Sequence, residues 1–433
     1  MLKGYIKKTL KILANLQLAI TLLFIIGLII AVGTVVEQDQ ALTFYKNSYP
    51  ELKPLFGFLT WKVIIFFSLD KVYTSWYFVV VLILFGSSLL ACTFTTQLPS
   101  IKLFKIWKFY TKKKQLTDLN ISESIKLKFF NSVPYQFNNT NYHFFRQQKK
   151  SYAYSGLLGR VAPVVVHLSI IILLLGSTIG SFGGFIAQQL VPRGELTHIQ
   201  NVTKFGKFSS LPQDLSIRVN DFWITYTADS QTDQFYSDLS VLNSQGKEIK
   251  RKTVFVNEPL TVEGVVLYQT DWDIIGLKLR LPNDQIFQVP LKKITKNGSK
   301  FWVGSLNFDS TLRQKYSVVS NSLNGKLSLY NEQGVKLNDL QLGEKIYLDK
   351  NIGLEVVDFI TSTGLQIKVD PGIQTVYASF LLLIISIYVS FFSYSQIWLV
   401  ETAKRITIGG NSNRAVLFFQ QEFRTLIKQS TLP

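Results

Sequence analysis

One histidine lies inside a long apolar stretch of this 433-residue sequence. Residues 160–176 read RVAPVVVHLSIIILLLG, so aliphatic side chains flank His167 on both sides. An imidazole in hydrocarbon loses its water, and such residues pair with another group, line a cavity or bind a ligand. Only the neutral ring is tolerated there, and the neutral ring is the form that coordinates a metal. His167 is therefore a candidate metal ligand, with hydrogen bonding between helices as the main alternative.

Other arrangements that could do chemistry are missing from the sequence. It holds a single cysteine, which excludes an intrachain disulfide, a CxxC redox pair and a cysteine-rich metal site. It contains no nucleophile elbow, no HExxH motif and no phosphate-binding glycine loop. The glycine-rich GSFGG at 180–184 follows no strand, and we interpret it as a flexible end of an apolar segment. His143 has no neighbouring ligands and is interpreted as a surface or packing residue.

The elements that must position His167 are membrane spans. Hydrophobic residues make up 47% of the chain, which is typical of a membrane protein with a sizeable extramembrane part. A span needs about 20 apolar residues, and four uncharged windows are long enough. The predicted spans are residues 12–36, 72–98, 161–184 and 371–400. His167 lies near the start of the third span, and an even number of spans places both termini on one side.

The distribution of charge predicts which side that is. Residues 1–11, 99–160 and 401–433 together carry a formal charge of +17, whereas residues 37–71 and 187–370 together carry +1. Because loops on the cytoplasmic side are rich in Lys and Arg, the termini are predicted to face the cytoplasm or stroma. The net charge of +18 is therefore a topology signal, and no nucleic-acid-binding motif accompanies it.

The predicted organisation is four transmembrane helices with a large β-rich domain between the third and fourth spans. Period-two patterning and frequent turn residues favour a sandwich-like or open-barrel fold for that domain. The non-membrane segments are the basic inner N-terminus 1–11, the outer loop 37–71 with an interfacial segment, the basic inner segment 99–160, the outer β-rich domain 185–370 and the basic inner tail 401–433.

Two features are expected within the basic inner segment. KLFKIWKFYTKKK, at 102–114, is predicted to be a basic helix on the membrane surface. SIKLKFF and YHFFRQQKKSYAYSG, at 124–130 and 142–156, show short alternating runs and predict a small hairpin-like element.

Spaced motifs along nearly the whole chain carry a family resemblance. The sequence resembles the ResB/CcsB family, the System II cytochrome c biogenesis proteins of plastids, cyanobacteria and many other bacteria. The order and spacing of the motifs carry the resemblance, since no single motif would suffice. In chain order they are GTVVEQ, VYTSWYFVVVLILFGSSLLAC, GLLGRVAPVVVHLSIIILLLGSTIG, FYSDLSVLNSQGKEI, VFVNEPLTVEGVVLYQTDWD, GLQIKVDPGIQTVYASF and GNSNRAVLFFQQEF.

The resemblance implies a function and partners. Members of this family act with a second membrane protein, CcsA, which carries a tryptophan-rich loop that handles haem. Together they bring haem b across the membrane and support its covalent attachment to apocytochromes c, here cytochrome f and a soluble c-type cytochrome. This chain lacks a tryptophan-rich signature of its own, so it is expected to be a non-catalytic subunit of the haem-attachment complex. The implied location is the plastid thylakoid with the large domain in the lumen, or else a cyanobacterial thylakoid or plasma membrane.

The resemblance also strengthens the ligand interpretation of His167. Haem iron takes axial histidine, and this chain offers no second histidine within a span. The second ligand would therefore come from CcsA, which makes the expected site intersubunit. Asp370, before Pro371, is expected to cap the fourth span, and it is also a functional candidate that could orient the outer domain. Asn257 and Gln269 are further functional candidates within the outer-domain motifs.

A different class of function remains open at this point. The protein could be a scaffold or assembly factor that docks client proteins through its outer β-domain and never contacts haem. Both interpretations predict the same spans and the same β-domain. They differ at His167: a scaffold should tolerate replacement of this histidine by an apolar residue, whereas a haem conduit should not.

Overall fold

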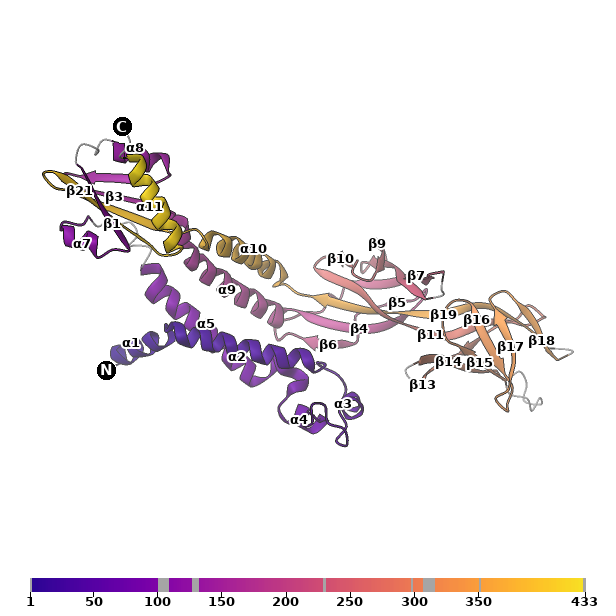
Figure 1. The fold of residues 1–433 in the computed structure, drawn as a ribbon. Helices are drawn as coiled ribbons and strands as arrows, with labels where there is room; N and C mark the ends of the chain where they lie inside the picture. Colours follow the sequence, from indigo (N-terminus) through magenta and orange to yellow (C-terminus); the bar gives the residue numbers. More distant parts are fainter. Residues whose placement is uncertain are drawn as a thin grey trace. The chain divides into compact units, whose positions relative to one another are not determined.

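The computed structural model describes residues 2–99, 109–126, 132–228, 231–296, 299–306, 316–349 and 352–430. The chain forms two compact units, one from Met1–Gly176 and Gln374–Pro433 and the other from Ser177–Ile373. Figure 1 gives the element labels used below.

Among the described residues, four helices are long and apolar enough to cross a membrane, which agrees with the predicted number of spans. They are α2 (Leu16–Val35), α5 (Trp76–Cys92) continued by the π-helical η2 (Thr93–Gln97), α9 (Leu157–Gly183) and α10 (Ile373–Ser390). A separate amphipathic helix, α1 (Leu2–Leu13), precedes α2. The two are divided at Asn15, whose side chain accepts a hydrogen bond from Gln17 N at 2.9 Å and caps α2.

Apolar side chains hold three of these helices together. Leu22 and Ile26 of α2 cluster with Phe78 and Phe85 of α5, and Leu174 of α9 packs against the same cluster. Burying large aliphatic and aromatic side chains maximises dispersion contacts, which drive helix association where lipid removes the hydrophobic contribution. The helix that carries His167 is therefore fixed against α5.

The fourth span is shorter than predicted. Helix α10 ends at Ser390, and residues Ser395–Glu401 form strand β20 in place of the last part of the predicted 371–400 window. The sequence of this strand fits a membrane span because Ile397, Trp398 and Leu399 are apolar. In the structure these side chains are buried in a β-sheet, which no local sequence pattern predicts.

The predicted basic tail 401–433 is also part of a folded unit. Residues 109–126, 132–155 and 394–430 form a discontinuous domain built on a five-stranded antiparallel sheet in the order β1-β21-β20-β3-β2. The strands are β1 (Ile121–Lys126), β2 (His143–Gln147), β3 (Lys150–Ser155), β20 and β21 (Arg405–Ser412). The helices are α7 (Lys113–Thr117), α8 (Ser132–Asn139) and α11 (Val416–Ser430).

This domain corrects the predicted hairpin. Strands β2 and β3 do form a hairpin, but β1 lies at the opposite edge of the sheet and pairs with β21. Phe137 of α8 and Phe419 and Phe423 of α11 are buried in one apolar cluster with the sheet. Most of the predicted surface helix at 102–114 lies outside the described residues.

The described residues of the inserted β-domain, which spans 185–370, form three antiparallel sheets, which confirms the predicted β-rich fold. The largest has the order β10-β11-β19-β4-β6, with β12 and β18 added on β11 and β19. Its strands are β4 (Phe185–Pro192), β6 (Val202–Phe205), β10 (Leu260–Val262), β11 (Val265–Arg280), β12 (Ile286–Pro290), β18 (Lys345–Asp349) and β19 (Ile352–Val369).

Two smaller sheets pack against this large sheet. One consists of β5 (Leu196–Thr197), β7 (Ser216–Tyr226), β8 (Thr232–Leu242) and β9 (Glu248–Phe255). The other is a meander of β13 (Lys292–Lys296), β14 (Ser299–Leu306), β15 (Tyr316–Ser320), β16 (Lys326–Tyr330) and β17 (Lys336–Gln341).

The long strands β11 and β19 run through much of the inserted β-domain (Figure 1), and their side chains contribute to both resulting hydrophobic cores. Leu267 and Leu365 lie in the first core, whereas Leu277 and Phe359 lie in the second. The β11–β19 pairing shifts register between Gln269/Asp271 and between Ile274/Gly276. Such irregularities bend a strand and increase its twist, so one pair of strands can serve two sandwiches.

Candidate functional site

His167 is presented by α9 toward the end of α5. Its side chain is half-buried, and Nδ1 lies 3.4 Å from the hydroxyl oxygen of Thr93 at the start of η2. The helix continues through Pro163, one turn before His167, although proline removes a backbone donor. The predicted histidine is therefore held in a continuous membrane-length helix, with one ring nitrogen directed at a neighbouring hydroxyl.

The arrangement fits a single axial ligand better than a closed metal site. In the part of the chain that the structure describes, no three His, Cys, Asp or Glu side chains gather to hold an ion. His143 is exposed and contacts Tyr154 in a tilted arrangement with ring centroids 5.1 Å apart. His198 Nδ1 lies 3.3 Å from Ser216 Oγ in the inserted β-domain. Haem iron, which the porphyrin already holds through four nitrogens, could take one of its axial ligands from His167.

Asp370 begins a turn that leads into α10. Its Oδ1 accepts a hydrogen bond from Gly372 N at 3.2 Å, and its Oδ2 pairs with Lys368 Nζ at 3.2 Å. The helix begins at Ile373, so Asp370 lies before the N-cap position and not at it, as the sequence had predicted. The capping expectation is thus modified: the carboxylate organises the turn before the helix.

The glycines near the end of α9 form a close-packing surface, which corrects their interpretation as a flexible terminus. A β-carbon at Gly176 would lie 3.1 Å from the side chain of Thr375, and one at Gly180 would lie 2.4 Å from Asp370 Oδ1. One at Gly184 would lie 2.5 Å from the Val369 carbonyl oxygen. Glycines four residues apart on one helix face allow such close approach, as in membrane helix pairs.

Asn257 and Gln269 occupy structural positions. Asn257 is exposed and has a left-handed backbone conformation with φ of 68°, which suits a turn between β9 and β10. Gln269 is only 6% exposed, and its Nε2 donates to Asp271 O at 3.3 Å beside the register shift in β11. Its Oε1 is buried without a hydrogen-bond partner among the described residues.

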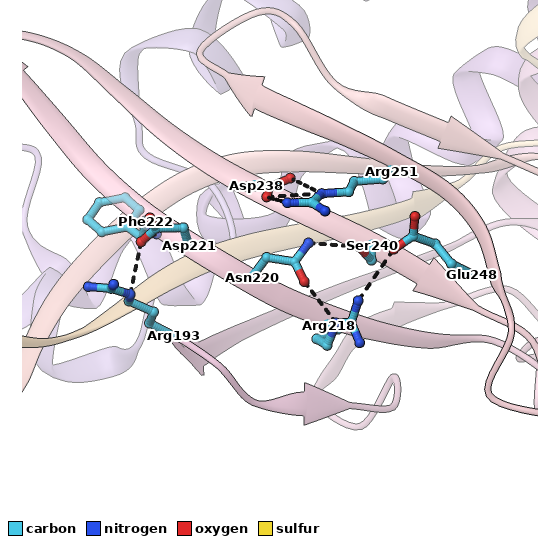
Figure 2. Close-up of polar contacts among 9 residues, drawn as sticks. All are labelled: Arg193, Arg218, Asn220, Asp221, Phe222, Asp238, Ser240, Glu248 and Arg251. Carbon is cyan, nitrogen blue, oxygen red and sulfur yellow. Dashed lines mark hydrogen bonds and ion pairs between the residues drawn. The ribbon is translucent and has the colours of Figure 1, made fainter.

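The SDL motif of strand β8 consists of Ser237, Asp238 and Leu239. It contacts strand β19, the first hydrophobic core and strand β9. Ser237 is fully buried, and its hydroxyl lies 2.8 Å from that of Thr363 on β19, which ties two sheets together. Leu239 points into the first core. Asp238 points to the other face, where Arg251 of β9 donates to both carboxylate oxygens (Figure 2). These hydrogen bonds from Arg251 hold the pKa of the Asp238 carboxyl below its ordinary value.

A charged network continues from this pair across the same sheet (Figure 2). Arg218 Nε donates to Asn220 Oδ1 at 2.8 Å, and Asn220 Nδ2 donates to Ser240 Oγ at 2.7 Å. Arg218 also pairs with Glu248 at 3.4 Å. Sequence reasoning missed this network because its members lie on three strands, although their alternate spacing along β7 and β8 was a usable signal.

The GTVVEQ motif closes the loop between α2 and α5. Gln38 Nε2 donates to Val36 O at 2.7 Å and to Leu69 O at 2.9 Å, while its Oε1 accepts from Val72 N at 2.9 Å. The glutamine thereby ties the end of α2 to η1 (Leu69–Thr74), the segment that precedes α5. Sequence reasoning used this motif only for the resemblance.

The neighbouring Glu37 anchors two tyrosines of the same loop. Its carboxylate accepts from Tyr49 Oη at 2.5 Å, and its backbone oxygen accepts from Tyr45 Oη, also at 2.5 Å. The bond from Tyr49 lowers the pKa of the Glu37 carboxyl, and burial raises the pKa of Tyr49 to about 12. The loop also contains α3 (Leu42–Ser48) and α4 (Trp61–Phe66), so it is a folded segment.

Comparison with known proteins places these features in a family. The model of the ResB-like family matches residues 16–298 and 285–424. The cytochrome c biogenesis protein Ccs1 of Emiliania huxleyi is 48% identical over 99% of this chain and 97% of its own length. Ccs1 of Thalassiosira pseudonana is 44% identical over 96% of this chain and 99% of its own length.

A cyanobacterial relative extends the comparison. The cytochrome c biogenesis protein CcsB of Picosynechococcus sp. is 41% identical over 96% of this chain and 90% of its own length. Similarity of this extent supports a role in cytochrome c biogenesis and a location in a membrane. With its matching family model, near-full-length relatives and four membrane-length helices, this chain belongs to the ResB-like family.

Proposed function

We propose that this protein is the membrane subunit that, with a CcsA-type partner, delivers haem across the membrane for attachment to apocytochromes c. Family membership and the names of the relatives support the general role. The observation that carries the haem proposal is His167, a half-buried imidazole in a membrane-length helix with one nitrogen facing a hydroxyl. The proposed location is a plastid thylakoid with the inserted β-domain in the lumen.

Haem b is the cargo in this proposal, and it supplies the iron that is bound. His167 provides one axial ligand from Nε2, because Nδ1 is engaged with Thr93. A second ligand comes from the partner, since the other histidines of this chain, His143 and His198, lie outside the spans. Helix α9 holds the imidazole at a fixed depth, and the apolar side chains around it keep the ring neutral.

The inserted β-domain serves the proposed function as a rigid platform. Two hydrophobic cores share β11 and β19, and no three His, Cys, Asp or Glu side chains among the described residues of this domain gather to hold a metal ion. A client-docking scaffold without haem remains the second candidate function. It is favoured by an open groove of about 460 Å³ on the large sheet, which is lined by Gln188, Gln189, Leu190, Asn201, Thr270, Asp271, Gly364 and Leu365.

Replacement of His167 separates the two functions. The full-length His167→Ala protein, co-expressed with its partner subunit, should insert normally, lack the haem Soret band and fail to mature c-type cytochromes. Added imidazole should restore part of the band by supplying the missing nitrogen. His143→Ala and His198→Ala are matched controls, because each removes a histidine outside the spans. A normal Soret band and normal cytochrome levels in His167→Ala would refute haem ligation and favour the scaffold.

A further inference from the structure

Thr93 makes two contacts that together constrain the ring of His167. The residue is only 7% exposed, at the junction where α5 passes into the π-helical η2. Its hydroxyl donates to Leu89 O at 2.7 Å, one turn earlier in α5. The same oxygen faces Nδ1 of His167 at 3.4 Å.

A threonine hydroxyl has one proton to donate, and its oxygen can also accept. Because the Thr93 hydroxyl donates its proton to the Leu89 carbonyl, the hydroxyl oxygen faces the His167 ring as an acceptor. A hydrogen bond between the two therefore requires the proton of the neutral imidazole to lie on Nδ1. Nε2 is then left with its lone pair, which is the form that binds a metal.

We infer that Thr93 is a positioning residue that holds His167 as the Nδ1–H tautomer and presents Nε2 to haem iron. This inference rests on the proposed function. Histidines that ligate metals generally donate their other ring N–H to a neighbouring oxygen, which fixes ring orientation and raises ligand basicity. The 3.4 Å separation is long for a hydrogen bond, and such contacts shorten when the ligand binds.

The backbone around Thr93 supports this role. Leu98 N donates to the Thr93 carbonyl, five residues back, so the helix is widened at this point. Single π-helical turns inside α-helices frequently occur at functional sites. Thr95 provides a contrast within the same turn: its hydroxyl donates to Ala91 O at 2.7 Å, but its side chain is exposed.

The tautomer can be measured without haem. Nitrogen NMR of the full-length chain labelled with 15N-histidine distinguishes protonated from unprotonated ring nitrogens, and only three histidines need assignment. His167→Ala identifies the signals. We expect a protonated Nδ1 in the wild type, its loss in the isosteric Thr93→Val, and its retention in Thr93→Ser. Thr95→Val, the matched control, should keep the wild-type signal. An unchanged tautomer in Thr93→Val would overturn the inference and leave haem ligation by His167 untouched.

A second experiment measures haem binding by the same variants, each co-purified with the partner subunit. Loss of a supporting hydrogen bond typically weakens metal binding by 10-fold or more, so Thr93→Val should bind haem about 10-fold more weakly. Its haem midpoint potential should also rise, because the ligand becomes less basic. Thr93→Ser and Thr95→Val should resemble the wild type. A full haem band in His167→Ala would refute the proposed function and, with it, the assignment of Thr93 to iron binding.

Discussion

The carboxylate of Asp370 occupies the space that a side chain at Gly180 would need. A β-carbon on Gly180 would lie 2.4 Å from Asp370 Oδ1. That oxygen accepts from Gly372 N at 3.2 Å, while the other carboxylate oxygen pairs with Lys368 at 3.2 Å. Because both oxygens are held, the carboxylate has little freedom to move aside. The glycine and the aspartate are therefore matched positions in the packing of α9 against the chain that enters α10.

Gly180→Ala should destabilise the protein for this reason. Crowding of a packed site typically costs about 1–3 kcal/mol, so the melting temperature and membrane abundance should both fall. Gly27→Ala is the control, because a β-carbon there meets no atom within 4 Å. The double variant Gly180→Ala/Asp370→Ala should recover part of the loss. Equal stability of Gly180→Ala and Gly27→Ala would contradict this account.

Gln38 should be essential to the loop between α2 and α5. Gln38→Ala removes three hydrogen bonds to Val36, Leu69 and Val72, each worth about 1 kcal/mol, so unfolding free energy should fall by about 2–3 kcal/mol. Thermal melts of the purified full-length chain measure the change. Gln40→Ala, two residues away at an exposed position, should melt like the wild type. A small effect at Gln38 would mean that the loop is held mainly by its tyrosines.

Gln269 should matter for stability more than for haem attachment. Gln269→Ala leaves a buried cavity, so protein abundance and cytochrome assembly should fall together. Gln269→Leu keeps the volume and should be tolerated better, because Oε1 already lacks a partner among the described residues. Immunoblots and haem staining of cytochromes compare the two effects. If Gln269→Ala abolished haem attachment at normal abundance, the residue would belong to the active machinery.

The Asp238–Arg251 pair should make stability depend on pH at the acid end. Arg251 lowers the pKa of Asp238 in the folded protein, so the pair stabilises above the ordinary carboxyl pKa of about 3.9. That contribution is lost as the pH falls through the lower folded pKa. Arg251 is 55% exposed, and solvent screening keeps the contribution small.

Asp238→Asn tests this dependence. Its melting temperature should be lower than the wild type at pH 7, and the difference should shrink as the pH falls below about 4. Asp339→Asn removes a carboxylate that pairs with Lys336 at an exposed site and should have a smaller effect at either pH. A difference between Asp238→Asn and wild type that stays constant with pH would point to packing as the cause.

The charge distribution predicts the side of the membrane on which the inserted β-domain lies. Alkaline phosphatase fused after residue 245, in the exposed turn between β8 and β9, should be active. A fusion after residue 120, within the basic segment, should be inactive, because positively charged segments stay on the cytoplasmic side. The reverse pattern would overturn the orientation and the lumenal placement proposed for the domain.

The sequence by itself determined the number of spans, because twenty apolar residues in a row are a local property. It also predicted a β-rich insertion, since the two-residue alternation of a half-buried strand is visible without its partners. His167 stood out for the same reason, as a polar residue inside a local apolar pattern. The family resemblance followed from the order of motifs along the chain.

Only the tertiary structure decided which residues meet. Strand β20 had the apolar composition of a span, and its pairing with β3, some 240 residues earlier, shows that it is part of a sheet. The hydroxyl of Thr93 reaches His167 across 74 positions, and Gly180 meets Asp370 across 190. Such contacts depend on how helices and strands pack, so composition and local periodicity carry no signal for them. The sequence could identify individual residues as candidates, and the tertiary structure showed which residues they contact.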